Sequence, residues 1–200
     1  MTMMDTMDTY NKYLEILREE LIPAQGCTEP IAIAFAGALV TKVLGVFPDH
    51  LEVACSGNMI KNAKSVVVPN SGGQKGIAVA ATLGAVGGNA DLLLQVLTPV
   101  TPADAERARQ LTAAEFCTVK LLNSIVNLHI LVTAVAGDNR AVVEIAEEHT
   151  NVVRVEKNGK VLQGGEYSSG VQKHDESRAF MSIAGIIEFA ERCDIEDVRE

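Results

Sequence analysis

The chain has 200 residues, of which 48% are hydrophobic and 22% are charged, so it has enough apolar side chains to build a sizeable core. Its 26 acidic and 17 basic residues give a formal net charge of −9, which repels phosphate backbones and anionic lipid headgroups and makes nucleic acid and membranes unexpected partners. The four cysteines include no C-x-x-C pair, which argues against a zinc site, a redox dithiol and a disulfide scaffold.

The first two predicted elements are helices. Residues 1–20 predict an amphipathic helix, because their apolar residues recur every three or four positions. This segment lacks the basic start and apolar run of a signal peptide, so we expect a cytoplasmic protein. The mostly apolar stretch 31–46 is shorter than the ~20 residues that span a bilayer and contains Lys42. It therefore predicts a buried helix, with Thr28 as its N-cap and Pro30 in its first turn.

Short strands, loops and helices alternate in the middle of the chain. Residues 50–55 predict a strand, followed by a turn at 56–58 and a short helix at 59–63. Residues 66–90 predict a strand, a glycine-rich loop and a helix of small residues, and residues 103–114 predict an amphipathic helix. The small side chains of the first of these two helices indicate close packing of its backbone.

The last third of the chain is rich in β-branched residues and predicts an antiparallel sheet. The predicted strands are 128–136, 141–148 and 152–156, and Asn158-Gly159 is a strong hairpin signal. Residues 166–177 predict a loop, and residues 177–192 predict a final helix with Ser177 as its N-cap. We therefore expect residues 1–200 to form a single α+β domain, with an antiparallel sheet from the second half and packed helices from both halves.

Cys27 is the first candidate for chemistry, because it stands just before the predicted helix start. The unpaired N–H groups and the positive end of a helix stabilise a thiolate, so Cys27 could be a nucleophile, a base or a metal ligand. A small thiol buried in a turn explains the same pattern, since free cysteine is among the most buried residue types. Cys55, Cys117 and Cys193 lie in apolar segments, and we expect them to be structural.

Three polar segments beside predicted strands are candidate binding sites. The loop from Asn70 to Gly76 could offer backbone N–H groups to an anion, although it is not a P-loop and glycine loops also serve tight turns. The other two segments, 56–62 and 149–151, fit plain turns equally well. The candidate substrate-binding residues are Ser56, Asn58, Lys61, Asn62, Asn70, Ser71, Gly72, Gly73, His149, Thr150 and Asn151, and we expect them to share one cleft with Cys27. The remaining histidines, His50, His129 and His174, lack partners at ligand spacing and are expected to be structural.

Four segments in chain order resemble the N-terminal half of the L-cysteine desulfidase family, whose members are relatives of the iron–sulfur L-serine dehydratases. The segments are PAQGCTEPIAIA at 23–34, VACSGNMIKNA at 53–63, VVVPNSGGQKGIAVAATLGAVGG at 66–88 and EIAEEHTNVVRVEKNG at 144–159. The resemblance implies a [4Fe-4S]-dependent lyase that converts L-cysteine to pyruvate, ammonia and sulfide, or L-serine to pyruvate and ammonia. It implies that Cys27 belongs to the active site, as a base or as a thiolate beside the cluster.

The cluster-binding C-terminal half of that family has no counterpart in this sequence. We therefore expect no [4Fe-4S] cluster and no activity on this chain alone, and the implied partners are the missing half or a second copy of the chain. The competing hypothesis is a non-catalytic domain that binds a small molecule or assembles with a separate partner chain. Because a carboxylate facing the sulfur would raise the pKa of the Cys27 thiol, we expect the Glu29 side chain to point elsewhere.

Overall fold

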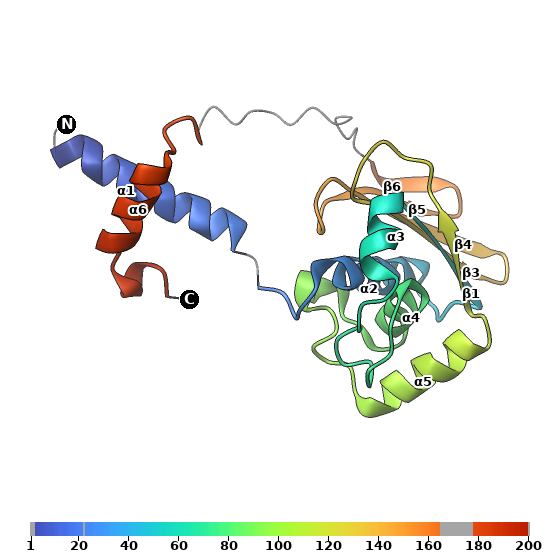
Figure 1. The fold of residues 1–200 in the computed structure, drawn as a ribbon. Coiled ribbons are helices and arrows are strands. Elements are labelled where there is room, and N and C mark those ends of the chain that lie inside the picture. The colour runs from blue at the N-terminus through green and yellow to red at the C-terminus, as the bar shows by residue number, and fades with distance from the viewer. Residues whose placement is uncertain (1–2, 22, 165–177, 200) are drawn as a thin grey trace. The chain divides into compact units, whose positions relative to one another are not determined.

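The computed structural model describes residues 3–21, 23–164 and 178–199, and it divides the chain into two compact units (Figure 1). We call the unit within residues 23–170 the sheet unit. We call the unit formed by the described residues before 23 and after 170 the helical unit. All strands of the described residues lie in the sheet unit.

The sheet unit contains a six-stranded sheet with the strand order β2-β1-β3-β4-β5-β6. Its strands are β1 (His50–Cys55), β2 (Cys117–Leu121), β3 (His129–Ala136), β4 (Asn139–Ala146), β5 (Val152–Lys157) and β6 (Lys160–Gly164). The β1–β2 pair is parallel and the other four neighbouring pairs are antiparallel. The predicted α+β class with a mainly antiparallel sheet is therefore confirmed.

Helices cover one face of this sheet, as Figure 1 shows. They are α2 (Thr28–Leu44), α3 (Gly57–Ala63), α4 (Ile77–Gly87), the short η1 (Ala90–Gln95) and α5 (Pro102–Ala113). The backbones of α2 and α4 approach closely: a Cβ atom on Gly37 would lie 2.4 Å from the Ala81 carbonyl oxygen, and one on Gly84 would lie 2.0 Å from the Ala34 carbonyl oxygen. Only glycine fits these two crossings, so the predicted close packing is confirmed. No helix within the described ranges combines the length and the apolar character needed to cross a bilayer.

The two faces of the sheet differ in chemistry because side chains alternate along each strand. On β1, Leu51 and Val53 are fully buried among the core residues, whereas Glu52 between them forms an ion pair with Lys120 of β2. The loop after β2 folds against the outer face, where Val126 packs in a small apolar cluster of its own. Polar side chains of the outer face are thus partly covered by this loop.

The helical unit consists of α1 (Met3–Glu20), α6 (Ile183–Arg192) and the short η3 (Ile195–Asp197). Its centre is aromatic: the ring of Tyr13 lies 5.2 Å from that of Phe180 and 5.0 Å from that of Phe189, and Tyr10 lies 5.2 Å from Phe189. The Tyr10 hydroxyl donates to the Asp197 carboxylate at 2.6 Å, and this bond raises the pKa of Tyr10 to about 12. These contacts join the two helices of the unit.

Two helix starts differ from the sequence prediction. The N-cap of α2 is Cys27 rather than Thr28, and its side chain makes no capping bond. Gly26, with φ of 143°, turns the chain so that Cys27 takes the extended conformation of an N-cap. The helix α6 begins at Ile183, and its N-cap is Ser182, whose hydroxyl accepts a bond from the Gly185 N–H at 3.0 Å. The predicted N-cap Ser177 and the predicted loop at 166–177 lie outside the described residues.

Two strand predictions also need correction. The strand expected after residue 66 is reduced to one bridge between Val67 and Lys75, because Pro69 has no N–H to continue a ladder. The strand β2 was not predicted. Its five residues CTVKL show no clean alternation, and four of them are exposed, so only the parallel partner β1 makes them a strand.

Candidate functional site

The centre of the candidate site is a thiol–carboxylate pair at the start of α2. Cys27 is exposed, and its thiol donates to the Glu29 Oε2 atom at 3.1 Å. The prediction that Glu29 points away from the sulfur is wrong. Cys27 is the N-cap and Glu29 is the second helical residue, so both side chains project from the first turn, and the carboxylate is also close to the helix N–H groups that favour an anion.

The pKa values of the two groups in this pair are shifted in opposite directions. Partial burial and the hydrogen bond to Glu29 raise the pKa of the Cys27 thiol, whereas the bond from Cys27 lowers the pKa of the Glu29 carboxyl. A helix N-terminus alone would lower a thiol pKa, but desolvation and the carboxylate outweigh it here. At neutral pH the sulfur therefore holds the proton and Glu29 is ionised.

Two other segments reach the same carboxylate. From α3, the Asn62 Nδ2 atom donates to Glu29 Oε1 at 3.4 Å. From the connection between β4 and β5, His149 lies near enough for its charge to lower the pKa of Glu29. The structure thus gathers three sequence-predicted residues, Cys27, Asn62 and His149, around Glu29, and we call these four residues the Cys27 cluster.

The other residues predicted for the same cleft have different surroundings. Ser56 is buried, and its hydroxyl donates to the Asn127 carbonyl at 2.5 Å, while Asn58 and Lys61 are exposed on α3. Thr150 and Asn151 line a groove of about 580 Å³ that α2 borders with Phe35, Leu39 and Val43. The Ser56 hydroxyl is thus engaged by a backbone carbonyl, and Thr150 and Asn151 line a groove to which Cys27 does not contribute, so the prediction of one shared cleft needs correction for these three residues.

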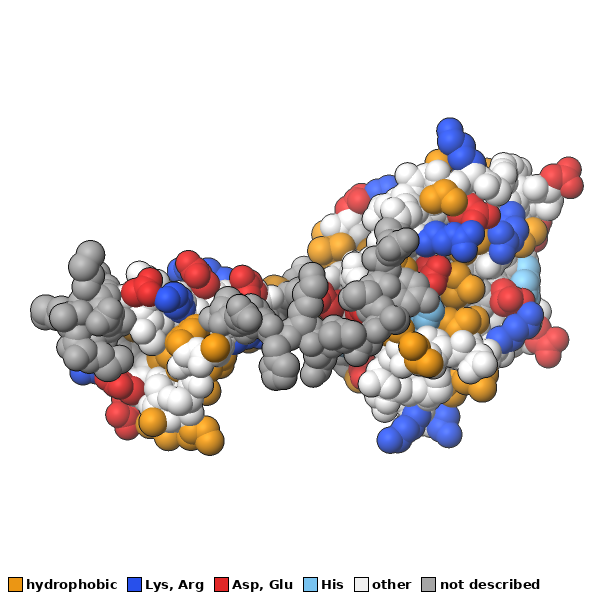
Figure 2. Space-filling view, turned by 90° about the horizontal axis from the view of Figure 1, so that it is seen from above, with side chains coloured by type: hydrophobic (Ala, Val, Ile, Leu, Met, Phe, Trp, Pro, Cys, Tyr) orange, Lys and Arg blue, Asp and Glu red, His pale blue; other side chains and the backbone are white. Residues whose placement is uncertain are grey.

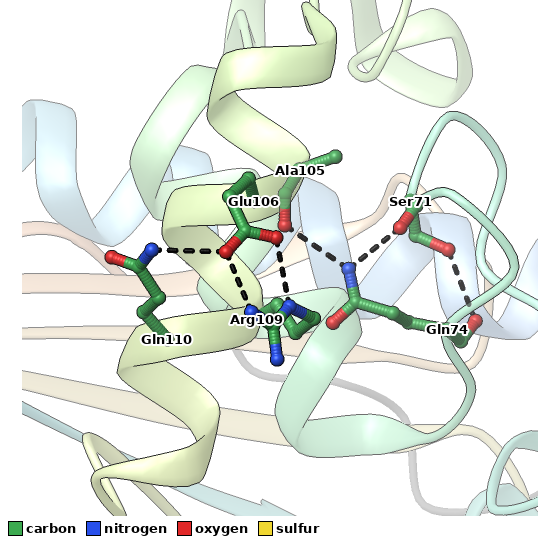
Figure 3. A network of polar contacts seen from close by, with 6 residues as sticks. All are labelled: Ser71, Gln74, Ala105, Glu106, Arg109 and Gln110. Atoms are coloured by element: carbon green, nitrogen blue, oxygen red, sulfur yellow. Dashed lines mark hydrogen bonds and ion pairs between the residues drawn. The ribbon is translucent and has the colours of Figure 1, made fainter.

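The glycine-rich loop opens toward α5, as Figure 3 shows. Asn70, Ser71 and Gly72 line a hollow of about 440 Å³ together with Glu106 and Arg109 of α5. The loop is closed by its own bonds, since the Ser71 hydroxyl donates to the Gln74 carbonyl at 3.0 Å and the Gln74 amide donates to the Ser71 carbonyl at 2.6 Å. The same amide donates to the Ala105 carbonyl of α5 at 3.0 Å. Gly73 of this loop is exposed.

One contact links the glycine-rich loop to the Cys27 segment. A Cβ atom on Gly26 would lie 3.4 Å from the Cγ atom of Pro69, which precedes Asn70. The loop is therefore a neighbour of the Cys27 cluster, but its hollow is lined by α5 and not by Cys27. Its Arg109 is already engaged by Glu106 at 2.6 Å, and this ion pair lowers the pKa of Glu106 to about 2.

Sequence reasoning did not find the hydrogen-bonded chain through His129. This buried ring lies between the Ser124 hydroxyl, 2.8 Å from Nδ1, and the Glu144 carboxylate, 2.8 Å from Nε2. The chain ties the loop after β2 to β4, which supports the structural role expected for His129. Glu29 was also absent from the predicted site, although its place two residues after Cys27 was a usable signal.

The cysteines do not form a ligand set for an iron–sulfur cluster. Burial raises the pKa of both Cys55 and Cys117 to about 12, and Cys193 belongs to the helical unit. In the part of the chain that the structure describes, no three His, Cys, Asp or Glu side chains are grouped so that they could hold a metal ion. Cluster ligation by several thiolates therefore does not fit these residues.

Comparison with known proteins gives one name repeatedly. The chain is 46% identical over 193 residues to a UPF0597 protein of Lachnoclostridium phytofermentans, covering 95% of this chain and 45% of the relative. It is 40% identical to a UPF0597 protein of Treponema denticola, covering 94% of this chain and 44% of the relative, and 41% identical to one of Desulfitobacterium hafniense, covering 96% and 44%. No family model matches the chain. The chain spans less than half the length of these curated relatives.

These comparisons correct the family assignment made from the sequence. The assignment to the L-cysteine desulfidase family is wrong, because the relatives that match nearly the whole chain are named UPF0597 proteins, a different family name. That name states neither an activity nor a cofactor.

Proposed function

We propose that the sheet unit binds a small amino acid at the Cys27 cluster and serves as the substrate-binding part of a lyase that removes its β-substituent. L-Cysteine, which would lose sulfide, and L-serine, which would lose water, are the substrates of choice. The observation that carries the proposal is the 3.1 Å contact between the exposed Cys27 thiol and the Glu29 carboxylate. In this contact the thiol proton lies beside the negative charge of the carboxylate, at the exposed N-terminus of α2.

The charges of the cluster complement those of an amino acid. The ionised Glu29 attracts the ammonium group of the substrate. The first N–H groups of α2 favour the carboxylate of the substrate. Asn62 and His149, from α3 and the β4–β5 connection, flank Glu29 and provide donors that can fix the substrate's orientation. A zwitterion is thus a better fit than a neutral or a purely anionic ligand.

The proton on Cys27 suits the departing group. β-Elimination takes a proton from Cα and needs a proton for the leaving sulfide or hydroxide. Because the pKa of Cys27 is raised, the thiol keeps its proton at neutral pH, and we assign it as a hydrogen-bond donor to the leaving group and not as the base. Glu29 stabilises the protonated thiol and orients it.

The other groups that the reaction needs are proposed to lie outside the Cys27 cluster. The chain spans less than half the length of its curated relatives, so the base for the Cα proton and any [4Fe-4S] cluster belong, in this proposal, to the additional polypeptide. The sheet unit by itself then binds substrate without converting it.

A second candidate function is a non-catalytic domain that binds a small molecule. The raised pKa of Cys27 favours it, because a thiol that stays protonated at neutral pH is a weak nucleophile and a weak base. The two candidates share the binding site and differ in whether any bond of the ligand is broken.

Calorimetric titration of the chain under reducing conditions tests the binding step. L-Cysteine and L-serine should bind more tightly than D-serine, and Cys27→Ala and Glu29→Gln should weaken binding about tenfold or more. Cys193→Ala is the matched control, because that thiol lies in the helical unit, and it should bind like the unaltered chain. Equal affinities for the unaltered chain and Cys27→Ala would contradict the proposal.

An assay of the intact Lachnoclostridium phytofermentans relative separates the two candidates. Release of pyruvate from L-cysteine or L-serine under anaerobic conditions supports the lyase. Binding by the chain without any pyruvate from the intact relative favours the non-catalytic domain.

A further inference from the structure

The helix α6 has an apolar stripe on the side that faces away from α1. Gly185 and Phe189 lie against Tyr13 of α1, since a Cβ atom on Gly185 would come within 2.7 Å of the tyrosine hydroxyl and the Phe189 ring lies 5.0 Å from the tyrosine ring. Three isoleucines with helical spacing lie outside this contact, Ile183 and Ile187 on the opposite side of the helix and Ile186 on its flank. We call these three residues the isoleucine stripe.

The stripe is exposed to an unusual degree for isoleucine, a residue type that is normally buried. The exposed fractions are 80% for Ile183, 43% for Ile186 and 53% for Ile187. Ile195 of η3 is 69% exposed, and Figure 2 shows hydrophobic side chains gathered on the visible face of this unit. An amphipathic helix whose apolar stripe faces solvent marks a surface that another polypeptide covers.

The small core of the helical unit also indicates that another polypeptide covers the stripe. Its core is a single aromatic cluster between two helices, and none of the α6 residues is buried. A core of this size supplies less burial than an independent domain needs. The unit therefore requires further apolar contacts, and the isoleucine stripe is the apolar surface of α6 that remains for them.

We propose that the isoleucine stripe docks onto the polypeptide that the UPF0597 relatives contain beyond the region matched by this chain. The match to these relatives covers 94 to 96% of this chain but 44 to 45% of each relative. More than half of each relative therefore lies outside the match, and this additional polypeptide is long enough to present a complementary apolar face. Isoleucines spaced by three and four residues fit the groove of a packed helix or helix pair. This proposal is independent of the proposed function.

Hydrogen exchange compares the stripe in the two proteins as they exist. Amide exchange of the peptide covering residues 183–192 is measured in the 200-residue chain and in the corresponding peptide of the intact Lachnoclostridium phytofermentans relative. We expect exchange at least tenfold slower in the intact relative, because docking suppresses local opening of α6. Equally fast exchange in both proteins would overturn the proposal.

Variants of the chain test the surface itself. The chain is co-expressed with the segment of that relative outside the match, and a complex of one chain with one segment is expected to co-purify. The combined variant Ile183→Glu, Ile186→Glu and Ile187→Glu should weaken the complex tenfold or more. Ile125→Glu, at a residue that is 86% exposed in the sheet unit, is the matched control and should leave the complex unchanged.

Two outcomes of this second experiment would overturn the proposal. One is a complex that survives the stripe variant with unchanged affinity. The other is a chain that doubles in mass on its own and becomes monomeric in the stripe variant, since a second copy would then be the occupant of the stripe. Circular dichroism of each variant shows whether its helices are retained.

Discussion

The sheet unit and the helical unit use similar apolar helices in opposite ways. In α2, eleven residues are buried, including Ile31 and Ile33 at 0% exposure, whereas no residue of α6 is buried although it contains three isoleucines and a phenylalanine. The difference lies in the neighbours: α2 packs against the sheet and α4, and α6 packs against α1. Apolar composition makes a helix ready for burial, but tertiary contacts decide whether burial occurs.

The same difference separates the kinds of surface that each unit offers. Cys27 and Glu29 of the Cys27 cluster lie at the first turn of the densely packed α2, so a rigid element positions these two side chains, as binding geometry requires. The isoleucine stripe stands on a thinly packed unit that gains its stability from further contacts. A site for a small molecule and a surface for a polypeptide are thus divided between the two units.

The largest expected effect breaks the packing of the sheet unit at its closest crossing. Gly84→Ala would place a methyl group 2.0 Å from the Ala34 carbonyl oxygen, and relieving this overlap should cost about 3 kcal/mol of unfolding free energy. Gly185→Ala in α6 is the control, because its clash is with a tyrosine hydroxyl that can move and because alanine favours helix by ~1 kcal/mol. Urea denaturation followed by circular dichroism measures both, and equal losses would refute the contrast.

Truncating an isoleucine in each unit sharpens the comparison. Ile31→Ala removes a fully buried side chain and should cost about 3 kcal/mol through lost burial and a cavity. Ile187→Ala removes a half-exposed side chain and should change the stability of the chain by less than ~0.5 kcal/mol. The midpoints of urea denaturation for the two variants give the answer. A large loss for Ile187→Ala would mean that the stripe is already covered in the chain itself.

The contribution of a polar contact in the sheet unit to the unfolding free energy should likewise increase with its burial. Glu144→Ala removes the carboxylate that bonds buried His129 at 2.8 Å and should cost about 2 kcal/mol. Glu52→Ala removes an exposed ion pair with Lys120 and should cost less than ~1 kcal/mol. Thermal unfolding of both variants measures the difference. Similar losses would show that burial does not set the strength of these contacts.

The smallest expected effect concerns the proton on Cys27. Because Glu29 and burial raise the pKa of the thiol, the rate of Cys27 alkylation by iodoacetamide should rise with a midpoint above that of an ordinary thiol. Glu29→Gln removes the negative charge that favours the protonated sulfur, so the midpoint should move to lower pH and the rate at pH 8 should increase a few-fold. Glu191→Gln, which alters an exposed carboxylate of the helical unit, is the control. An unchanged midpoint would contradict the role of Glu29 in raising the pKa of the Cys27 thiol.

Much of the fold could be predicted from the sequence because local patterns determine it. The apolar run of α2, the small residues of α4 and the Asn158-Gly159 hairpin, in which both residues have positive φ, all appear in the structure as expected. The strand β2 could not be predicted, since its five residues become a strand through a parallel partner more than sixty positions away in the chain. Non-local pairing leaves no mark on a short, exposed segment.

The candidate site was harder to predict for the same reason. Cys27, Asn62 and His149 carried polar or reactive side chains at element ends, which the sequence shows. The direction of Glu29 and the opening of the glycine loop toward α5 depend on how helices pack, which the sequence does not show. His129 found its partners Ser124 and Glu144 on a loop and a neighbouring strand, at no spacing that a motif would reveal.

The measurement that most directly tests the difference between the units uses the protein's own tyrosines. The chain has no tryptophan and three tyrosines. Two of them, Tyr10 and Tyr13, lie in the aromatic cluster of the helical unit, and Tyr167 lies outside the described residues. Urea unfolding is followed in parallel by tyrosine fluorescence and by far-ultraviolet circular dichroism at 218 nm, a wavelength at which strand signal is strong. We predict that the tyrosine transition occurs at lower urea than the circular dichroism transition, because the helical unit opens first. Coincident transitions would contradict the account, since the two units would then unfold as one.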